Sequence, residues 1–177
     1  MNAETAIADH GRLIEPATLE IQRLLPGPPD RIWAYLTESD LRRQWLASGE
    51  MELKPDAPFE LVWRNDELTD PPGDKPEGFG CEHRMTCRII EAEEPRFLAF
   101  TWGENSEVSF TLEPRGEKVL LTILHSRAPD RSTLLMVSAG WHAHLDVLAA
   151  CAAGTEPTPF WDNWLRLKED YDRRLPA

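Results

Sequence analysis

The middle of the chain is a series of short segments in which apolar and polar residues alternate, and this pattern constrains the fold more than any other. Val108, Phe110 and Leu112 alternate with Ser109 and Thr111, as in a strand with one buried face. Clusters of proline and glycine separate the segments, which predicts an antiparallel meander. Strands are predicted at 17–25, 51–53, 59–64, 82–91, 96–103, 108–112 and 118–125.

Helical patterns flank this meander. The longest helix is predicted over 130–153, where small and apolar residues recur at helical spacing and Gly154 is placed to end it. Its inner stripe is Leu134, Ser138, Trp141, Leu145 and Leu148. Two short helices are predicted after the first strand. The first buries Ile32, Trp33 and Leu36; the second is capped by Ser39 and buries Leu41, Trp45 and Leu46. The order predicts an α+β fold in which a curved sheet packs around the long helix.

Charge and hydropathy exclude several classes of partner. The 177 residues include 31 acidic and 19 basic side chains, a net charge of −12, so neither nucleic acid nor an anionic membrane is expected as a partner. No uninterrupted apolar run approaches the ~20 residues that span a bilayer. The first residues lack the basic and apolar regions of a signal peptide, which predicts a cytoplasmic protein. Cys81, Cys87 and Cys151 are expected to be reduced thiols.

The chain divides into three predicted parts. Residues 1–16 are a loose extension with room for one helical turn and a solvated His10, residues 17–153 form the domain, and residues 154–177 add a helix that begins near Pro159. The segment Asn65–Gly80 is rich in Asp, Glu, Pro and Gly and predicts a loop. This loop acts either as a lid or as a passive connection.

Three motifs resemble one known group of proteins: the helix pair Arg31–Thr37 and Trp45-Leu46, the strand end Leu121–Ser126, and the pattern Gly140-Trp141-x3-Leu145-x2-Leu148. Together they resemble bacterial members of the START-like (SRPBCC) superfamily, in the branch named for the C-terminal domain of the activator of Hsp90 ATPase. The resemblance covers residues 17–153 and implies a helix-grip fold. It also implies binding of lipids, polyketides or other apolar molecules between sheet and helix. Some proteins of the superfamily are cyclases, hydrolases or resistance proteins. The resemblance to this branch also implies a role in the stress response.

Residues on the predicted inner faces of the strands and the long helix are the candidate ligand contacts. The apolar candidates are Trp63, Met85, Phe100, Trp102, Phe110, Ile123, Met136 and Trp141. For each tryptophan, packing in a filled core is the alternative to lining a cavity. His83 and His125 alternate in register with apolar neighbours, so either could orient a ligand or be a satisfied core histidine.

The sequence favours no catalytic or metal site. His142 and His144 lie about 200° apart around a helix and cannot both reach one ion. Cys87 and His83 are four residues apart on a strand, about 13 Å, too far for a base to activate the thiol. No nucleotide-binding glycine loop is present, and no cofactor is expected.

Three hypotheses for function follow. The first is binding of a small hydrophobic molecule in a cavity between the sheet and the long helix. The second is a protein-interaction or chaperone-associated module that works through an exposed apolar patch with Phe160, Trp161 and Trp164, with a homodimer as one form. The third, an enzyme of cyclase or hydrolase type, requires two polar groups to meet inside the cavity and ranks below the other two.

Overall fold

Seven strands form one antiparallel sheet in the order β1-β2-β7-β6-β5-β4-β3. The computed structural model describes residue 8 and residues 10–175. The strands are β1 (Arg12–Glu15), β2 (Thr18–Pro26), β3 (Pro58–Trp63), β4 (His83–Glu93), β5 (Phe97–Trp102), β6 (Ser106–Arg115) and β7 (Lys118–Ser126). The predicted α+β helix-grip class is confirmed, and six of the predicted strands appear with small shifts at their ends.

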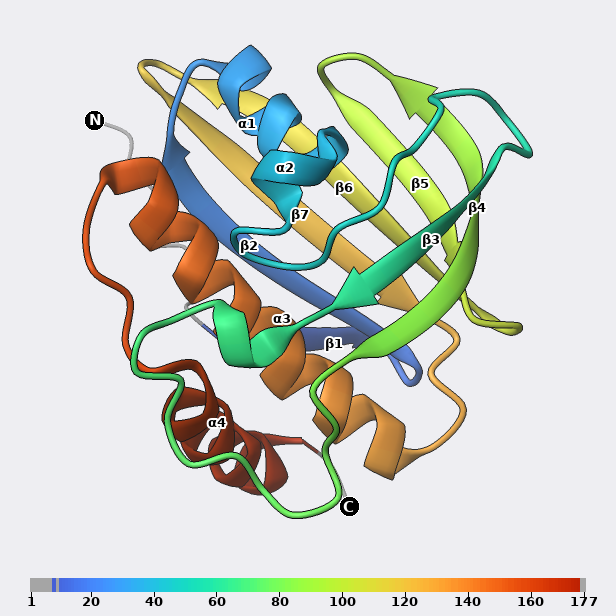
Figure 1. Cartoon of the computed structure of the whole chain (residues 1–177). Helices are drawn as coiled ribbons and strands as arrows, with labels where there is room; N and C mark the ends of the chain where they lie inside the picture. Colours follow the sequence, from blue (N-terminus) through green and yellow to red (C-terminus); the bar gives the residue numbers. More distant parts are fainter. Residues whose placement is uncertain (1–7, 9, 176–177) are drawn as a thin grey trace, which may run out of the picture.

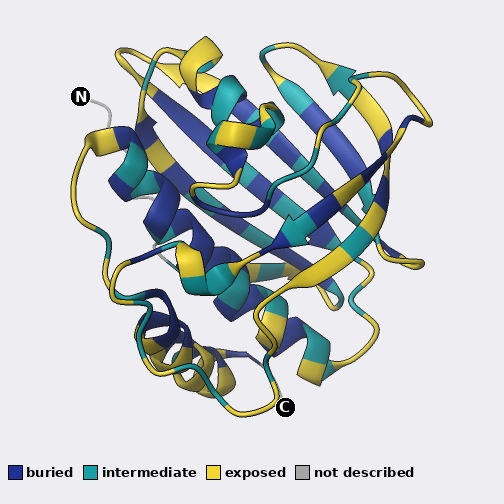
Figure 2. Cartoon of the chain, in the orientation of Figure 1, coloured by how far each residue is buried: buried dark blue, intermediate teal, exposed yellow. Residues whose placement is uncertain are grey.

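The long helix α3 (Arg131–Ala153) crosses the concave face of this sheet (Figure 1). Asp130 caps it by accepting a 2.7 Å hydrogen bond from the Thr133 N–H, and Gly154 ends it in the left-handed region at φ 71°. The whole predicted inner stripe is buried, and most of the middle of α3 is dark blue in Figure 2. Sequence periodicity therefore located both the ends and the buried side of this helix.

By length and composition, α3 is also the one helix among the described residues that could cross a membrane. However, 61% of its apolar 18-residue window is buried inside the fold. The apolar character of α3 is therefore explained by the sheet that covers it.

Two short helices, α1 (Pro29–Thr37) and α2 (Ser39–Arg42), lie over one end of the sheet (Figure 1). Ile32, Trp33 and Leu36 are buried, as predicted. The second helix is shorter than predicted, because Trp45 and Leu46 lie after it in a turn. Both of these side chains are buried as predicted, whereas Leu41 is only half-buried. Ser39 is not the cap either: its hydroxyl accepts a 2.9 Å hydrogen bond from the Gly49 N–H.

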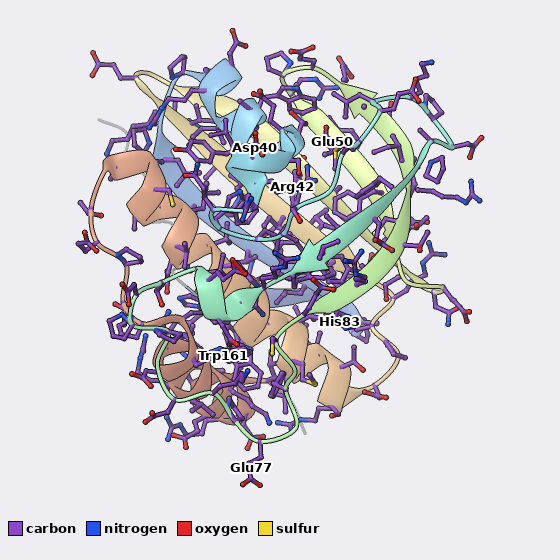
Figure 3. The ribbon with its side chains drawn as sticks, viewed as in Figure 1. Asp40, Arg42, Glu50, Glu77, His83 and Trp161 are labelled. Atoms are coloured by element: carbon purple, nitrogen blue, oxygen red, sulfur yellow. The ribbon has the colours of Figure 1, made fainter. Side chains whose placement is uncertain are left out.

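Arg42 at the end of α2 explains this departure. Its side chain is only 1% exposed, and its guanidinium donates to the carbonyls of Leu36, Thr37, Ala47 and Gly49. Figure 3 shows Arg42 beneath α2, with Glu50 on the segment that follows. One side chain therefore ties the carbonyl end of α1 to the chain that leads into β3.

The last helix, α4 (Phe160–Arg174), packs on α3 and is covered by the long loop between β3 and β4. In this loop, which begins with the 3-10 turn η1 (Asn65–Glu67), Asp66 accepts a 2.8 Å hydrogen bond from the Trp161 indole, and Thr69 accepts one of 2.9 Å from the Phe160 N–H. Phe160, Trp161 and Trp164 are consequently buried. The predicted exposed patch on this helix is therefore wrong.

Two further predictions fail in the first third of the chain. Residues 12–15 are not loose: they form the edge strand β1, and the neighbouring Gly11 N–H donates to the Tyr171 hydroxyl at 2.6 Å. His10 is half-buried, with its ring 4.8 Å from that of His142. The helical turn predicted within residues 1–16 could therefore lie only before β1, where residues 1–7 and 9 are outside the described residues. Residues 51–53 are not a strand, because the Lys54 N–H bonds to the Glu52 carbonyl (2.8 Å) and turns the chain.

Candidate ligand cavity

A cavity of about 370 Å³ lies where the β3–β5 end of the sheet faces the middle of α3. The strands contribute Trp63, His83, Met85 and Trp102; α3 contributes Met136, Gly140 and His144; α4 contributes Phe160, Trp161 and Trp164. The loop between β3 and β4 closes the remaining side with Asn65 and residues 78–82. In Figure 3, His83 and Trp161 mark its strand side and its α4 side.

Aromatic rings form most of the wall. Trp63 and Trp102 meet edge to face with their ring centres 5.4 Å apart, and Phe79 of the loop contacts Trp161 (5.1 Å) and Trp164 (5.3 Å). Such contacts hold flat side chains in fixed orientations, so the wall presents both ring faces and edges to the interior. The volume falls within the range of roughly 300–1,000 Å³ typical of small-molecule sites.

A second compartment of about 170 Å³ adjoins the first. Trp63, Trp102, Met136, Gly140 and His144 line both compartments, and the second adds Leu46, Val137 and Trp141. The two are therefore parts of one hollow that extends between α3 and the sheet. Met136 is 44% exposed, which places this flexible side chain at the opening.

Gly140 is the point on α3 where the helix gives room to the cavity. A Cβ built on this residue meets no atom within 4 Å, although neighbouring positions on the same helix are buried. We predict that Gly140→Ala raises the free energy of unfolding by about 1 kcal/mol, because alanine favours a helix interior over glycine by this amount. Urea unfolding followed by tryptophan fluorescence measures this change. A destabilised variant would contradict the open space seen at this position.

The structure separates the predicted contact residues into two groups. Six lie on the wall: Trp63, His83, Met85, Trp102, Met136 and Trp141. Four others line neither compartment and are almost fully buried behind it: Phe100, Phe110, Ile123 and His125. The second group supports the wall, since the Phe110 ring lies 5.8 Å from Trp141 and the Phe100 ring 6.4 Å from Trp102.

His125 holds one of these wall residues in place. Its Nδ1 accepts a 3.0 Å hydrogen bond from the Trp141 indole N–H, and its ring lies 5.2 Å from Trp102. Because an indole nitrogen can only donate, Nδ1 carries no proton. Burial lowers the pKa of His125 to about 4, so the ring is neutral at physiological pH. Its Nε2 is buried and finds no hydrogen-bond partner among the described residues.

His144 is a wall residue that the sequence analysis considered only as a metal ligand and not as a ligand contact. It lies on α3 outside the predicted stripe, yet it lines both compartments and its ring is 4.9 Å from Phe160. Its Nδ1 is 2.7 Å from the Trp45 carbonyl oxygen. Burial lowers its pKa to about 4, against the opposing effect of this hydrogen bond. A helical position four residues after Gly140 was the signal that could have placed it beside the cavity.

The polar side chains around the cavity do not form a nucleophilic or metal site. Burial raises the pKa of Cys87 to about 12, so this residue stays a thiol, and it does not line the cavity. Within residue 8 and residues 10–175, no three His, Cys, Asp or Glu side chains are grouped to hold a metal ion.

Comparison with known proteins agrees with this architecture. The family described as activator of Hsp90 ATPase homolog 1-like protein matches residues 26–153. The chain belongs to this family. The resemblance to the branch named for the activator of Hsp90 ATPase is thereby confirmed. A search of functionally curated proteins gave no match.

Solved structures similar to the chain extend over most of its length. A Bordetella parapertussis protein determined by solution NMR is 37% identical, with a TM-score of 0.80 over 100% of this chain and 97% of its own. CalU16 from Micromonospora echinospora is 21% identical, with a TM-score of 0.66 over 88% and 86% of the two chains. DynU16, from the dynemicin biosynthetic locus, is 20% identical, with a TM-score of 0.62 over 81% and 50%. The last two likenesses show the fold alone.

Proposed function

We propose that this family member binds a small, predominantly apolar molecule in the cavity between the β3–β5 end of the sheet and α3. The observation that carries the proposal is the aromatic-lined hollow of about 370 Å³, with a further 170 Å³ compartment beside it, between the sheet and α3. A concave, mostly apolar site with a few polar groups is the usual form of a small-molecule site.

The wall is suited to apolar ligands in two ways. Trp63, Trp102 and Trp141 offer large apolar surfaces, whose burial against a ligand contributes roughly 25 cal/mol per Å². The strands, two helices and a loop anchored by hydrogen bonds hold these rings before any ligand arrives, which reduces the entropy lost on binding. His83, Met85 and Met136 complete the proposed contacts near the opening.

Filling the space at Gly140 tests the proposal. We expect isothermal titration calorimetry to show binding of the uncharged aromatic 2-methoxynaphthalene to the wild-type protein, and Gly140→Phe to weaken it at least tenfold. A phenyl ring at this position projects from the helix into both compartments. Sterols and fatty acids belong in the same titration, because they are the other apolar classes of this size.

Ala153→Phe is the matched control. It adds the same bulk to an exposed position on the same helix, away from both compartments, and should bind as the wild type does. Failure of every ligand class to bind the wild type would overturn the proposal. Equal affinity of Gly140→Phe and Ala153→Phe would show that binding takes place elsewhere.

A further inference from the structure

We infer that the cavity selects uncharged aromatic molecules that carry a hydrogen-bond donor, such as a hydroxyl group, and that the Nε2 atom of His144 is the acceptor that recognises this donor. The inference rests on the proposed function and names the ligand class and the residue that determines it. It follows from the tautomer of one histidine and from the charges around the cavity.

The tautomer of His144 is fixed by the backbone. A carbonyl oxygen can only accept, so at 2.7 Å from the Trp45 oxygen the Nδ1 atom must carry the proton. A neutral imidazole then has an unprotonated Nε2 with a lone pair. The low pKa of about 4 keeps the ring in this neutral form at physiological pH. His144 therefore offers an acceptor and no second donor.

This acceptor has no partner of its own. No residue in the described part of the chain hydrogen-bonds to Nε2, while the ring lines both compartments. His144 is only 6% exposed and lies in a largely aromatic wall, so a ligand that packs on it displaces water and leaves this acceptor unmatched unless the ligand brings a donor.

The surrounding charges disfavour an anionic ligand. As far as the structure describes them, the walls of both compartments contain no lysine or arginine. The acidic wall residue Glu82 accepts hydrogen bonds from Arg64 (3.1 Å) and Arg84 (2.8 Å), and Arg84 also donates to Glu60 (2.8 Å). Both guanidinium groups are therefore already committed. A carboxylate entering the cavity would lose its water without gaining a cation.

Three ligands of one shape test the inference by calorimetry at pH 7.5. 2-Naphthol is uncharged and has a donor, 2-methoxynaphthalene has no donor, and 2-naphthoate is an anion. We expect 2-naphthol to bind about fivefold more tightly than 2-methoxynaphthalene, the gain of one net hydrogen bond. We expect 2-naphthoate to bind at least tenfold more weakly than 2-naphthol. This comparison uses only the wild-type protein, so it does not depend on any variant folding.

His144→Phe then tests the residue. The ratio of the 2-naphthol and 2-methoxynaphthalene affinities should fall to about one, whereas Ala153→Phe, on the same helix but away from both compartments, should leave it as in the wild type. In the wild type, 2-naphthol should shift the Nε2 nitrogen resonance of His144, and 2-methoxynaphthalene should not. A general structural defect would weaken both ligands and preserve the ratio.

The outcomes separate the two proposals. Binding of neither uncharged naphthalene to the wild type overturns this inference, and the proposed function falls with it only if the sterols and fatty acids also fail to bind. Equal affinities for all three ligands, or tighter binding of 2-naphthoate, overturns the inference and leaves the proposed function intact. If the affinity ratio falls to about one in His83→Phe, at the other wall histidine, but not in His144→Phe, the ligand hydroxyl binds His83. The role of His144 is then overturned.

Discussion

Replacing Arg42 with methionine should lower the free energy of unfolding by about 4 kcal/mol, measured by urea unfolding at pH 7.5. Methionine fills much of the same volume but leaves the buried carbonyls of Leu36 and Ala47, and the part-buried ones of Thr37 and Gly49, without their donor. Burial lowers the pKa of Arg42 to about 10, an effect opposed by the Glu50 carboxylate, so the guanidinium remains charged near neutrality. Its hydrogen bonds are therefore the stronger, charge-assisted kind.

Two variants make the Arg42 result specific. Arg42→Lys keeps the charge but cannot direct donors to four carbonyls at once, so we expect it to recover only part of the lost stability. Arg43→Met changes the exposed neighbouring residue and should alter stability by no more than about 0.5 kcal/mol. A loss below about 1 kcal/mol in Arg42→Met would show that water or local rearrangement satisfies these carbonyls.

Arg42 also shows where sequence patterns stop predicting structure. The alternation of Val108, Phe110 and Leu112 and the helical spacing in 130–153 predicted β6 and α3, because burial of one face repeats at a fixed interval. The burial of Arg42 depends instead on carbonyls brought together by the turn after α2. The strand expected at 51–53 failed for a related reason, since a local turn at Glu52–Lys54 took precedence over a two-residue alternation.

Sequence patterns likewise predicted the part of the candidate site that lies on regular strands, and missed the part that depends on contacts distant in sequence. Trp63 and Trp102 lie on the wall because alternation placed them on inner strand faces. The hypothesis of an interaction module placed Phe160, Trp161 and Trp164 at the surface, since nothing in their spacing indicates that a loop nearly a hundred residues earlier would cover them. The role of His144 also depends on a contact that is distant in sequence, because its Nδ1 lies against the Trp45 carbonyl, 99 positions away.

Lowering the pH from 7.5 to 5 should reduce the free energy of unfolding by about 4 kcal/mol, and two buried histidines should account for the loss. Burial lowers the pKa of both His125 and His144 from 6.5 to about 4. As the pH falls, the unfolded chain takes up a proton on each near pH 6.5, while the folded protein does not until about pH 4. The unfolded state thus binds more protons in this window and gains about 2 kcal/mol per histidine by pH 5.

Variants assign the loss to these two groups. The pKa values of Asp66 and Asp170 are lowered by hydrogen bonds, from Lys75 and Arg173 respectively, so their contribution to stability is lost mainly as the pH falls below the ordinary aspartate pKa of about 4. His125→Gln and His144→Gln should each remove about half of the difference in stability between pH 7.5 and pH 5, whatever their stability at pH 7.5. His83→Gln, at an exposed position, should leave the difference as in the wild type. If the double variant keeps the full loss, the two histidines must already be charged, or accessible to protons, in the folded protein. The fixed tautomer of His144 inside the cavity would then be wrong as well.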